Sequence, residues 1–286
     1  MMQTIRPCPR HTDQIRTEGT AHVNVIPEPP AAPDASETLG HPDLTGLVIV
    51  VAGATGAAGP PLVERLARAG ATVVAAGSSR DRIERVVADI GARMPAAGHG
   101  RIHAAVVDLL DEPATREWAS EVGREHGRVD GLVHLVGGWR GGTGIVSTDL
   151  ADWDWLHDRL IRTFQHTSRA FHDPIKASPR GRLVLISTFQ ATAPSATSAS
   201  YAAAKAAAEA WALAVADSFK NTGAAPKDSG AAAVILQIKA LLTAEMLAAK
   251  PDASFSGYTP VGDLADTIHD LWLTPAADLN GQRLRG

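Results

Sequence analysis

Cysteine is almost absent from this chain of 286 residues, because Cys8 is the single one. One thiol forms neither an intrachain disulfide nor a thiolate metal site, which excludes disulfide scaffolds and zinc fingers and suits a reducing cytosol. The chain also has no excess of basic residues, because it contains 27 Lys and Arg and 31 Asp and Glu, which gives a formal net charge of -4. We therefore expect no nucleic-acid partner.

Long apolar runs are also lacking. No stretch reaches the roughly 20 apolar residues of a membrane-spanning helix, and the start MMQTIRPCPRH has no apolar core of the signal-peptide type. We expect a cytoplasmic protein with no membrane partner. Its 45% hydrophobic content is enough to build a sizeable core.

The first 45 residues lack hydrophobic periodicity and hold seven of the 18 prolines. Such a segment cannot bury enough apolar surface to order itself. We predict a disordered, Pro-rich tail over residues 1–45 and a single domain over residues 46–286. A docking arm for a partner and a start-site artefact are alternative interpretations of this composition.

From Leu47 onward, short apolar runs alternate with amphipathic stretches. The runs predict strands over residues 47–52, 72–76, 102–107, 131–136, 182–187 and 232–238, with a short seventh at the C-terminal QRLRG. Helices are predicted over residues 59–70, 80–94, 113–127, 150–177, 199–220 and 262–273. This alternation is typical of an α/β, Rossmann-type doubly wound parallel sheet, which binds ligands at the carboxyl ends of its strands.

A glycine-rich turn follows the first predicted strand and leads into a helix that begins with two prolines. Glycines at this place let the backbone approach a pyrophosphate and direct the helix N-terminus at its charge. The turn predicts a nucleotide site. Its residues are Gly53, Thr55, Gly56, Ala57 and Gly59.

The end of the second predicted strand bears on the choice of cofactor. No carboxylate ends that strand, whereas Ser78 and Arg80 follow it and could hold a 2′-phosphate. This predicts NADP, with NAD possible because Asp81 is near. Asp108, at the end of the third strand, is placed either to contact the adenine or to cap the next helix.

Tyr201 and Lys205 are four residues apart, which places them on one face of a predicted helix. A lysine cation favours the phenolate, so the pair predicts a tyrosine whose pKa is lowered toward neutrality. By itself, Tyr-x-x-x-Lys arises by chance in many Ala-rich helices.

Together, the GATGAAG turn and the YAAAK pair resemble the short-chain dehydrogenase/reductase family from about Leu47 to the C-terminus. The resemblance implies an NADP-preferring oxidoreductase that interconverts a carbonyl and an alcohol. Tyr201 would be the proton donor or acceptor, and Lys205 would lower its pKa and hold the nicotinamide ribose. Thr188 would hold the carbonyl oxygen, while Gly137 and Thr243 would contact the cofactor.

The resemblance also implies a homodimer or homotetramer, paired through the two long helices at about 150–177 and 199–220. Within the domain, residues from Thr243 to Tyr258 are expected to form a lid over the substrate. Trp139, in a glycine-rich loop, is expected to form a wall of the substrate pocket.

Two positions depart from the family pattern. His134-Leu135-Val136-Gly137 replaces an Asn-Asn-Ala-Gly run, and Leu160 replaces the asparagine that anchors a water of the proton relay. These departures favour the alternative of a catalytically weak nucleotide-binding regulatory or scaffold protein. His134 is interpreted as a satisfied core histidine, or as a substitute in the relay.

The predicted helix 150–177 carries three histidines, a residue type that binds zinc. His157, His166 and His172 lack the i, i+4 spacing of a zinc pair, so no metal site is predicted.

Overall fold

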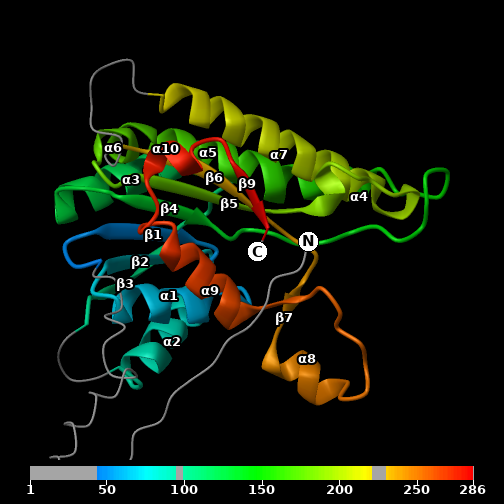
Figure 1. Ribbon diagram of the computed structural model, residues 1–286, viewed down its shortest axis with the longest axis horizontal. Coiled ribbons are helices and arrows are strands. Elements are labelled where there is room, and N and C mark those ends of the chain that lie inside the picture. Colours follow the sequence, from blue (N-terminus) through cyan, green and yellow to red (C-terminus); the bar gives the residue numbers. More distant parts are fainter. Residues whose placement is uncertain (1–43, 95–98, 221–229, 286) are drawn as a thin grey trace, which may run out of the picture. The chain divides into compact units, whose positions relative to one another are not determined.

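The computed structural model describes residues 44–94, 99–220 and 230–285, which form a parallel sheet with helices on both faces (Figure 1). The seven strands have the order β3-β2-β1-β4-β5-β6-β9. They are β1 (Val48–Ala52), β2 (Thr72–Gly77), β3 (Ile102–Val106), β4 (Gly131–His134), β5 (Arg182–Thr188), β6 (Ala232–Ile238) and β9 (Arg283–Arg285). This confirms the predicted Rossmann-type α/β fold.

The continuous apolar runs form central strands because both faces of the sheet are covered. In β1, Ile49 and Val51 belong to one core cluster, and Val48 and Val50 belong to the cluster on the opposite face. Strand order reverses between β1 and β4, which pair in parallel. Ligands bind at such a switch point in open α/β sheets.

The first core cluster lies under α1 (Gly59–Arg68), α2 (Arg80–Gly91), α9 (Val261–Asp270) and α10 (Ala276–Leu279). The second lies under α3 (Glu112–His126), α5 (Thr163–Ala170), α6 (His172–Ala177) and α7 (Ala199–Ser218). Figure 1 shows the two helical layers on either side of the sheet. No helix within the described ranges is both long and apolar enough to cross a membrane.

The helix predicted over residues 150–177 is broken in the structure. It comprises α4 (Ala151–Leu156), a π-helical turn (His157–Arg162), α5 and α6. The hydroxyl of Thr163, which directly follows the π-helical turn, donates to the Arg159 carbonyl at 2.6 Å and so competes with the backbone ladder. Periodicity alone does not reveal such an interruption.

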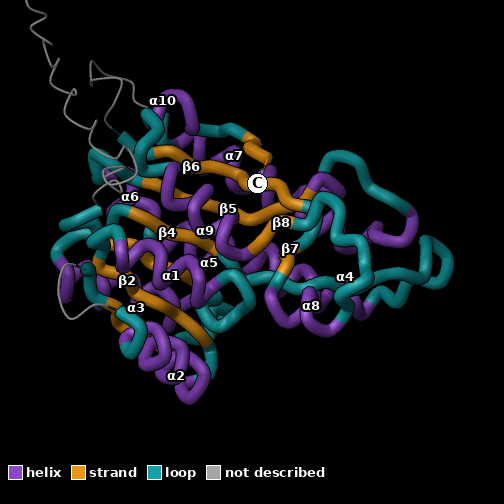
Figure 2. Tube along the Cα trace, turned by 60° about the horizontal axis from the view of Figure 1, so that its bottom comes forward, coloured by secondary structure: helices purple, strands orange, loops and turns teal. Residues whose placement is uncertain are grey.

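Small elements between β6 and α9 were not predicted. The two-stranded ribbon of β7 (Leu241–Leu242) and β8 (Thr259–Pro260) flanks α8 (Ala244–Ala249). In Figures 1 and 2, α8 and α4 lie beyond the same end of the sheet. The structure also places Leu44 in the core, whereas residues 1–43 lie outside the described residues, so the disordered tail stays a prediction.

Candidate active site

The glycine turn between β1 and α1 needs its glycines for close backbone packing. Gly53 has φ +84°, and a Cβ there would lie 2.9 Å from the Val136 nitrogen. A Cβ on Gly59 would lie 2.0 Å from the Ala54 carbonyl oxygen. The turn is therefore held against the loop after β4, and no side chain caps the N-terminus of α1.

A cavity of about 480 Å³ opens beside this turn. Predicted cofactor residues that line it are Gly53, Thr55, Gly56, Ala57, Ser78, Asp108 and Gly137. Gly59 does not line the cavity; it is buried at the first turn of α1.

Of the two arginines after β2, Arg80 does not lie where the prediction put it. Arg80 is directed at solvent, where its Nη1 lies 3.1 Å from Glu84 Oε1 and its side chain is 70% exposed. Arg82 lines the nucleotide cavity instead. Residues two apart do not share a helix face, so only one of the two can point inward.

Asp108 lines the nucleotide cavity, and its Oδ1 accepts a hydrogen bond from the Leu110 nitrogen at 3.0 Å. It does not cap the next helix. Asp111 caps α3 by accepting from the Ala114 nitrogen at 2.9 Å. Of the two interpretations of Asp108, the placement beside the nucleotide cavity agrees with the structure.

A second cavity, of about 570 Å³, contains Tyr201 and Lys205. It shares Leu135, Val136, Gly137, Gly138 and Leu241 with the nucleotide cavity. Its other walls come from β5, from the segment after β6, and from Trp139, Met246 and Tyr258. Met246 and Tyr258 belong to the predicted lid segment, and Trp139 was predicted as a pocket wall.

The Tyr201 and Lys205 side chains come from the same face of α7. Lys205 Nζ donates to the Ile186 carbonyl at 2.8 Å and lies 6.0 Å from the Tyr201 ring centroid. Burial lowers the pKa of Lys205 to about 8, although the negative charge of Glu209 opposes this shift. Burial raises the pKa of Tyr201 above its ordinary value, so the predicted lowering is wrong for the chain by itself.

Two predicted contacts lie outside both cavities. Thr188 is buried, and its hydroxyl accepts a hydrogen bond from the Gln190 nitrogen at 3.4 Å. Its neighbours Ser187 and Gln190 line the cavity in its place. The Thr243 hydroxyl accepts from the Met246 nitrogen at 3.3 Å and thereby caps α8.

The two departures from the family pattern have distinct surroundings. His134 is buried between the hydroxyls of Thr163 and Thr167, at 3.3 Å from Nε2 and 3.1 Å from Nδ1. Burial, followed by the charge of Lys205, lowers the pKa of His134 to about 3. It is a satisfied core histidine. Leu160 packs in a buried apolar cluster against which the Tyr201 side chain is packed.

Several cationic side chains at the cavities were missed by sequence analysis. Arg159 lines the nucleotide cavity, and its guanidinium lies 4.7 Å from the Trp155 ring centroid. Lys239 lines the catalytic cavity and donates to the Ser256 carbonyl at 2.7 Å. No motif marks either residue, because their positions depend on the π-helical turn and the ribbon.

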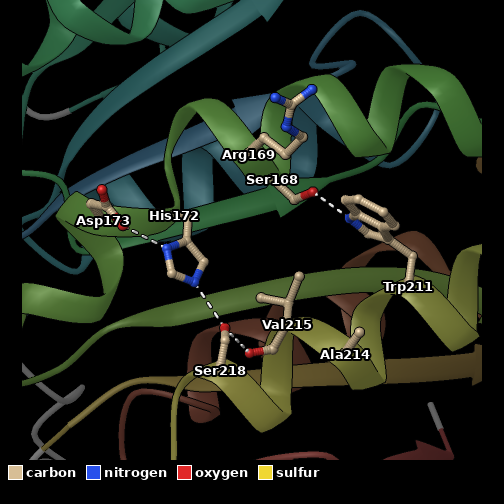
Figure 3. A pocket seen from close by; sticks show the side chains of 8 residues that line it. All are labelled: Ser168, Arg169, His172, Asp173, Trp211, Ala214, Val215 and Ser218. Carbon is tan, nitrogen blue, oxygen red and sulfur yellow. Dashed lines mark hydrogen bonds and ion pairs between the residues drawn. The ribbon is translucent and has the colours of Figure 1, made fainter.

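A further cavity, of about 310 Å³, lies between α5, α6 and α7 (Figure 3). In it, His172 Nδ1 lies 2.7 Å from Asp173 Oδ1, and Nε2 lies 2.8 Å from Ser218 Oγ. The order Ser-His-Asp suggests a hydrolytic triad. However, Ser218 donates to the Val215 carbonyl at 2.6 Å, at a helix C-terminus that would repel an oxyanion. This group is a helix cap.

Comparisons with known proteins identify the family of this chain. Residues 47–225 match the family described as short chain dehydrogenase. Sulfoacetaldehyde reductase 2 from Chromohalobacter salexigens is 27% identical over a stretch covering 43% of this chain and 46% of that relative. The chain spans about half the length of the first curated relatives that it matches.

Solved structures extend the likeness to the whole described domain. A short chain dehydrogenase from Burkholderia cenocepacia in complex with NADP is 25% identical with a TM-score of 0.67, covering 85% of this chain and 96% of that one. An NADPH-bound short chain oxidoreductase from Pseudomonas aeruginosa, with an atypical catalytic center, is 23% identical with a TM-score of 0.72 over 85% of this chain and 96% of that one. The family match covers more than half of the chain, which therefore belongs to the short-chain dehydrogenase family.

Proposed function

We propose that this protein is an NADP(H)-dependent oxidoreductase that interconverts a carbonyl and an alcohol. The observation that carries the proposal is the junction of two cavities, one beside the glycine turn and one around Tyr201 and Lys205, through shared lining residues. A nucleotide that fills the first cavity would bring its reactive end to the second.

In the direction of reduction, bound NADPH supplies a hydride to the carbonyl carbon. Tyr201 donates its phenolic proton to the carbonyl oxygen, which becomes the hydroxyl of the alcohol. The Lys205 cation stabilises the negative charge that develops in this transfer. The Gln190 amide, which lines the cavity where Thr188 does not, would donate the hydrogen bond that holds the carbonyl oxygen.

Arg82 and Ser78 support NADP as the cofactor. Both line the end of the nucleotide cavity that follows β2, where the family reads the adenosine ribose. A guanidinium and a hydroxyl suit a 2′-phosphate, whereas NAD specificity ordinarily uses a carboxylate there. Solved relatives with NADP or NADPH bound agree with this choice.

The charge of the catalytic cavity supports an anionic carbonyl substrate. Lys205 and Lys239 both line it, and no Asp or Glu is among the described residues of its wall. The ammonium of Lys239 has two further donors beside the bond to Ser256. A relative named sulfoacetaldehyde reductase is consistent with a small substrate that carries a negative group.

Turnover is measured from NADPH absorbance with a panel of aldehydes and ketones, in which each carboxylate or sulfonate compound is matched with a neutral analogue. Tyr201→Phe should lower kcat by about 100-fold or more with NADPH affinity retained. Lys239→Met should raise KM for the anionic member of each pair alone. Tight NADPH binding without turnover in the parent would instead favour the regulatory or scaffold alternative.

Assembly and location are further parts of the proposal. A homodimer or homotetramer would pair the outer faces of α5 and α7, where the cavity of Figure 3 leaves Trp211 and Ala214 accessible to a partner helix. Light scattering on the purified protein measures the assembly. We also propose a cytoplasmic location, which fractionation of the source cells would test.

A further inference from the structure

We propose that His103, Glu125 and His126 bind a transition-metal ion of the zinc type, at a site separate from the catalytic and nucleotide cavities. His103 is in β3, and the other two residues are in the last turn of α3. One ligand atom from each of the three side chains lies within 4.8 Å of the other two. Elsewhere in the described ranges, no three His, Cys, Asp or Glu side chains gather in this way.

The carboxylate of Glu125 is shared by the two imidazoles. Its Oε1 lies 3.6 Å from His103 Nδ1 and 3.9 Å from His126 Nε2. The two rings are edge to face, with centroids 4.8 Å apart and an interplanar angle of 69°. One nitrogen of each ring thus lies within 4 Å of the same carboxylate oxygen.

Two imidazoles and one carboxylate are a ligand set that zinc accepts, at about 2.0–2.2 Å from each ligand atom. Three ligands at such distances from one ion would lie about 3.3–3.6 Å apart around a tetrahedron. The present separations need only small side-chain rotations to reach this range. Mg²⁺ and Ca²⁺ prefer oxygen ligands throughout, so the two imidazoles select against them.

Part of the site is preorganised by packing. The His126 side chain is only 11% exposed, whereas Glu125 is 62% exposed and can turn toward an incoming ion. His103 lies near the start of the edge strand of the sheet. An ion held here would join the start of β3 to the end of α3.

This position gives the metal a structural role. The connection from β3 to α3 includes Val107, Asp108, Leu109 and Leu110, all of which line the nucleotide cavity. The proposed ligands lie at the opposite end of the same strand-helix unit, where β3 starts and α3 ends, remote from Tyr201. We therefore expect metal binding to stabilise the fold without changing the chemical step.

The test is zinc titration of the metal-free, full-length protein by calorimetry, with Co²⁺ absorption as a second readout. The parent should bind one equivalent in the micromolar range, and a hundredfold excess over Kd should raise Tm by roughly 5 °C. His103→Gln, Glu125→Gln and His126→Gln should each weaken binding by about tenfold or more. Glu125→Gln is the variant least able to disturb the fold, because its side chain is largely exposed.

His172→Gln is the matched control, since His172 also lies beside a carboxylate but with no third ligand. It should bind zinc as the parent does. Zinc held by other histidines would survive all three ligand variants, and that result would overturn the proposal. Absence of binding by the parent up to millimolar zinc would overturn it as well.

Discussion

At the scale of single residues, burial decides ionisation in this domain more than charged neighbours do. His134 and Lys205 both have lowered pKa values, to about 3 and about 8, and in each the first cause is removal from water. The Tyr201 pKa is raised for the same reason. The phenol and ammonium are thus both held nearer their neutral forms than they would be in water.

His134 provides a test of this effect through stability. Its folded pKa lies below the ordinary value of 6.5, so the unfolded chain binds more protons between pH 6.5 and about 3. Folding stability should therefore fall as pH falls through this window, by up to about 1.4 kcal/mol per pH unit. His134→Gln should reduce this slope in urea unfolding measured across the window. His157→Gln, whose side chain is 32% exposed, is the control, and an unchanged slope in His134→Gln would contradict the prediction.

Arg80 and Arg82 provide a test of cofactor recognition. Because Arg82 lines the nucleotide cavity and Arg80 pairs with Glu84, Arg82→Ala should weaken NADPH binding by about tenfold and leave NADH binding nearly unchanged. Arg80→Ala should change neither by more than about twofold. Fluorescence titration of both variants measures this. Equal losses for the two cofactors in Arg82→Ala would argue against a 2′-phosphate contact.

Site residues were predictable from sequence where the backbone turn fixes their position. Gly53, Thr55 and Gly56 line the cavity because the turn itself forms its wall. Side chains on a helix or strand were less predictable. Arg80 and Thr188 have suitable positions along the chain, yet Arg80 pairs with Glu84 and the Thr188 hydroxyl accepts from Gln190.

At the scale of elements, the central strands were predictable because they are buried on both faces and leave short, continuous apolar runs. β5 and β6 pair over their whole lengths, from Arg182 with Ala232 to Thr188 with Ile238. The π-helical turn and the β7–β8 ribbon were not predictable. They depend on local hydrogen bonds, such as that of Thr163 with Arg159, which have no periodic signature.

Two glycines in helices are expected to respond oppositely to alanine. A Cβ on Gly59 would lie 2.0 Å from the Ala54 carbonyl oxygen, so Gly59→Ala should cost about 3 kcal/mol of stability and weaken NADPH binding. A Cβ on Gly123 meets nothing within 4 Å, so Gly123→Ala should stabilise α3 by about 0.5–1 kcal/mol. Urea unfolding of both variants measures the difference. If the free energy of unfolding changed similarly in the two variants, the close backbone packing at Gly59 would not be what determines the effect of the substitution.

At the scale of the whole described domain, one buried carboxylate joins the helix of the active site to the edge of the sheet. Glu209, one turn after Lys205 in α7, accepts hydrogen bonds from Ser187 of β5 at 2.6 Å and Gln237 of β6 at 2.8 Å. Arg283 of β9 donates to its other oxygen at 2.6 Å. The C-terminal strand is thereby coupled to the position and charge of α7.

This coupling predicts opposite effects of two variants on the pH dependence of turnover. Glu209→Gln removes the negative charge that supports the Lys205 cation, so the pKa of Lys205 should fall below about 8. Arg283→Gln leaves that negative charge without its partner, so the pKa of Lys205 should rise. Reduction requires the ammonium, so turnover should decline as pH rises through the pKa of Lys205. This alkaline decline should begin at a lower pH in Glu209→Gln than in the parent, and at a higher pH in Arg283→Gln.

Stability measurements separate this electrostatic effect from structural damage. Each variant disrupts the same buried group of hydrogen bonds, so both should lose stability, by about 2–4 kcal/mol in urea unfolding. Structural damage alone would lower turnover in both variants without moving the alkaline limb of the pH profile. Opposite shifts of that limb, at comparable stability, are expected only if Glu209 and Arg283 act through the charge of Lys205. Shifts in the same direction would contradict this coupling.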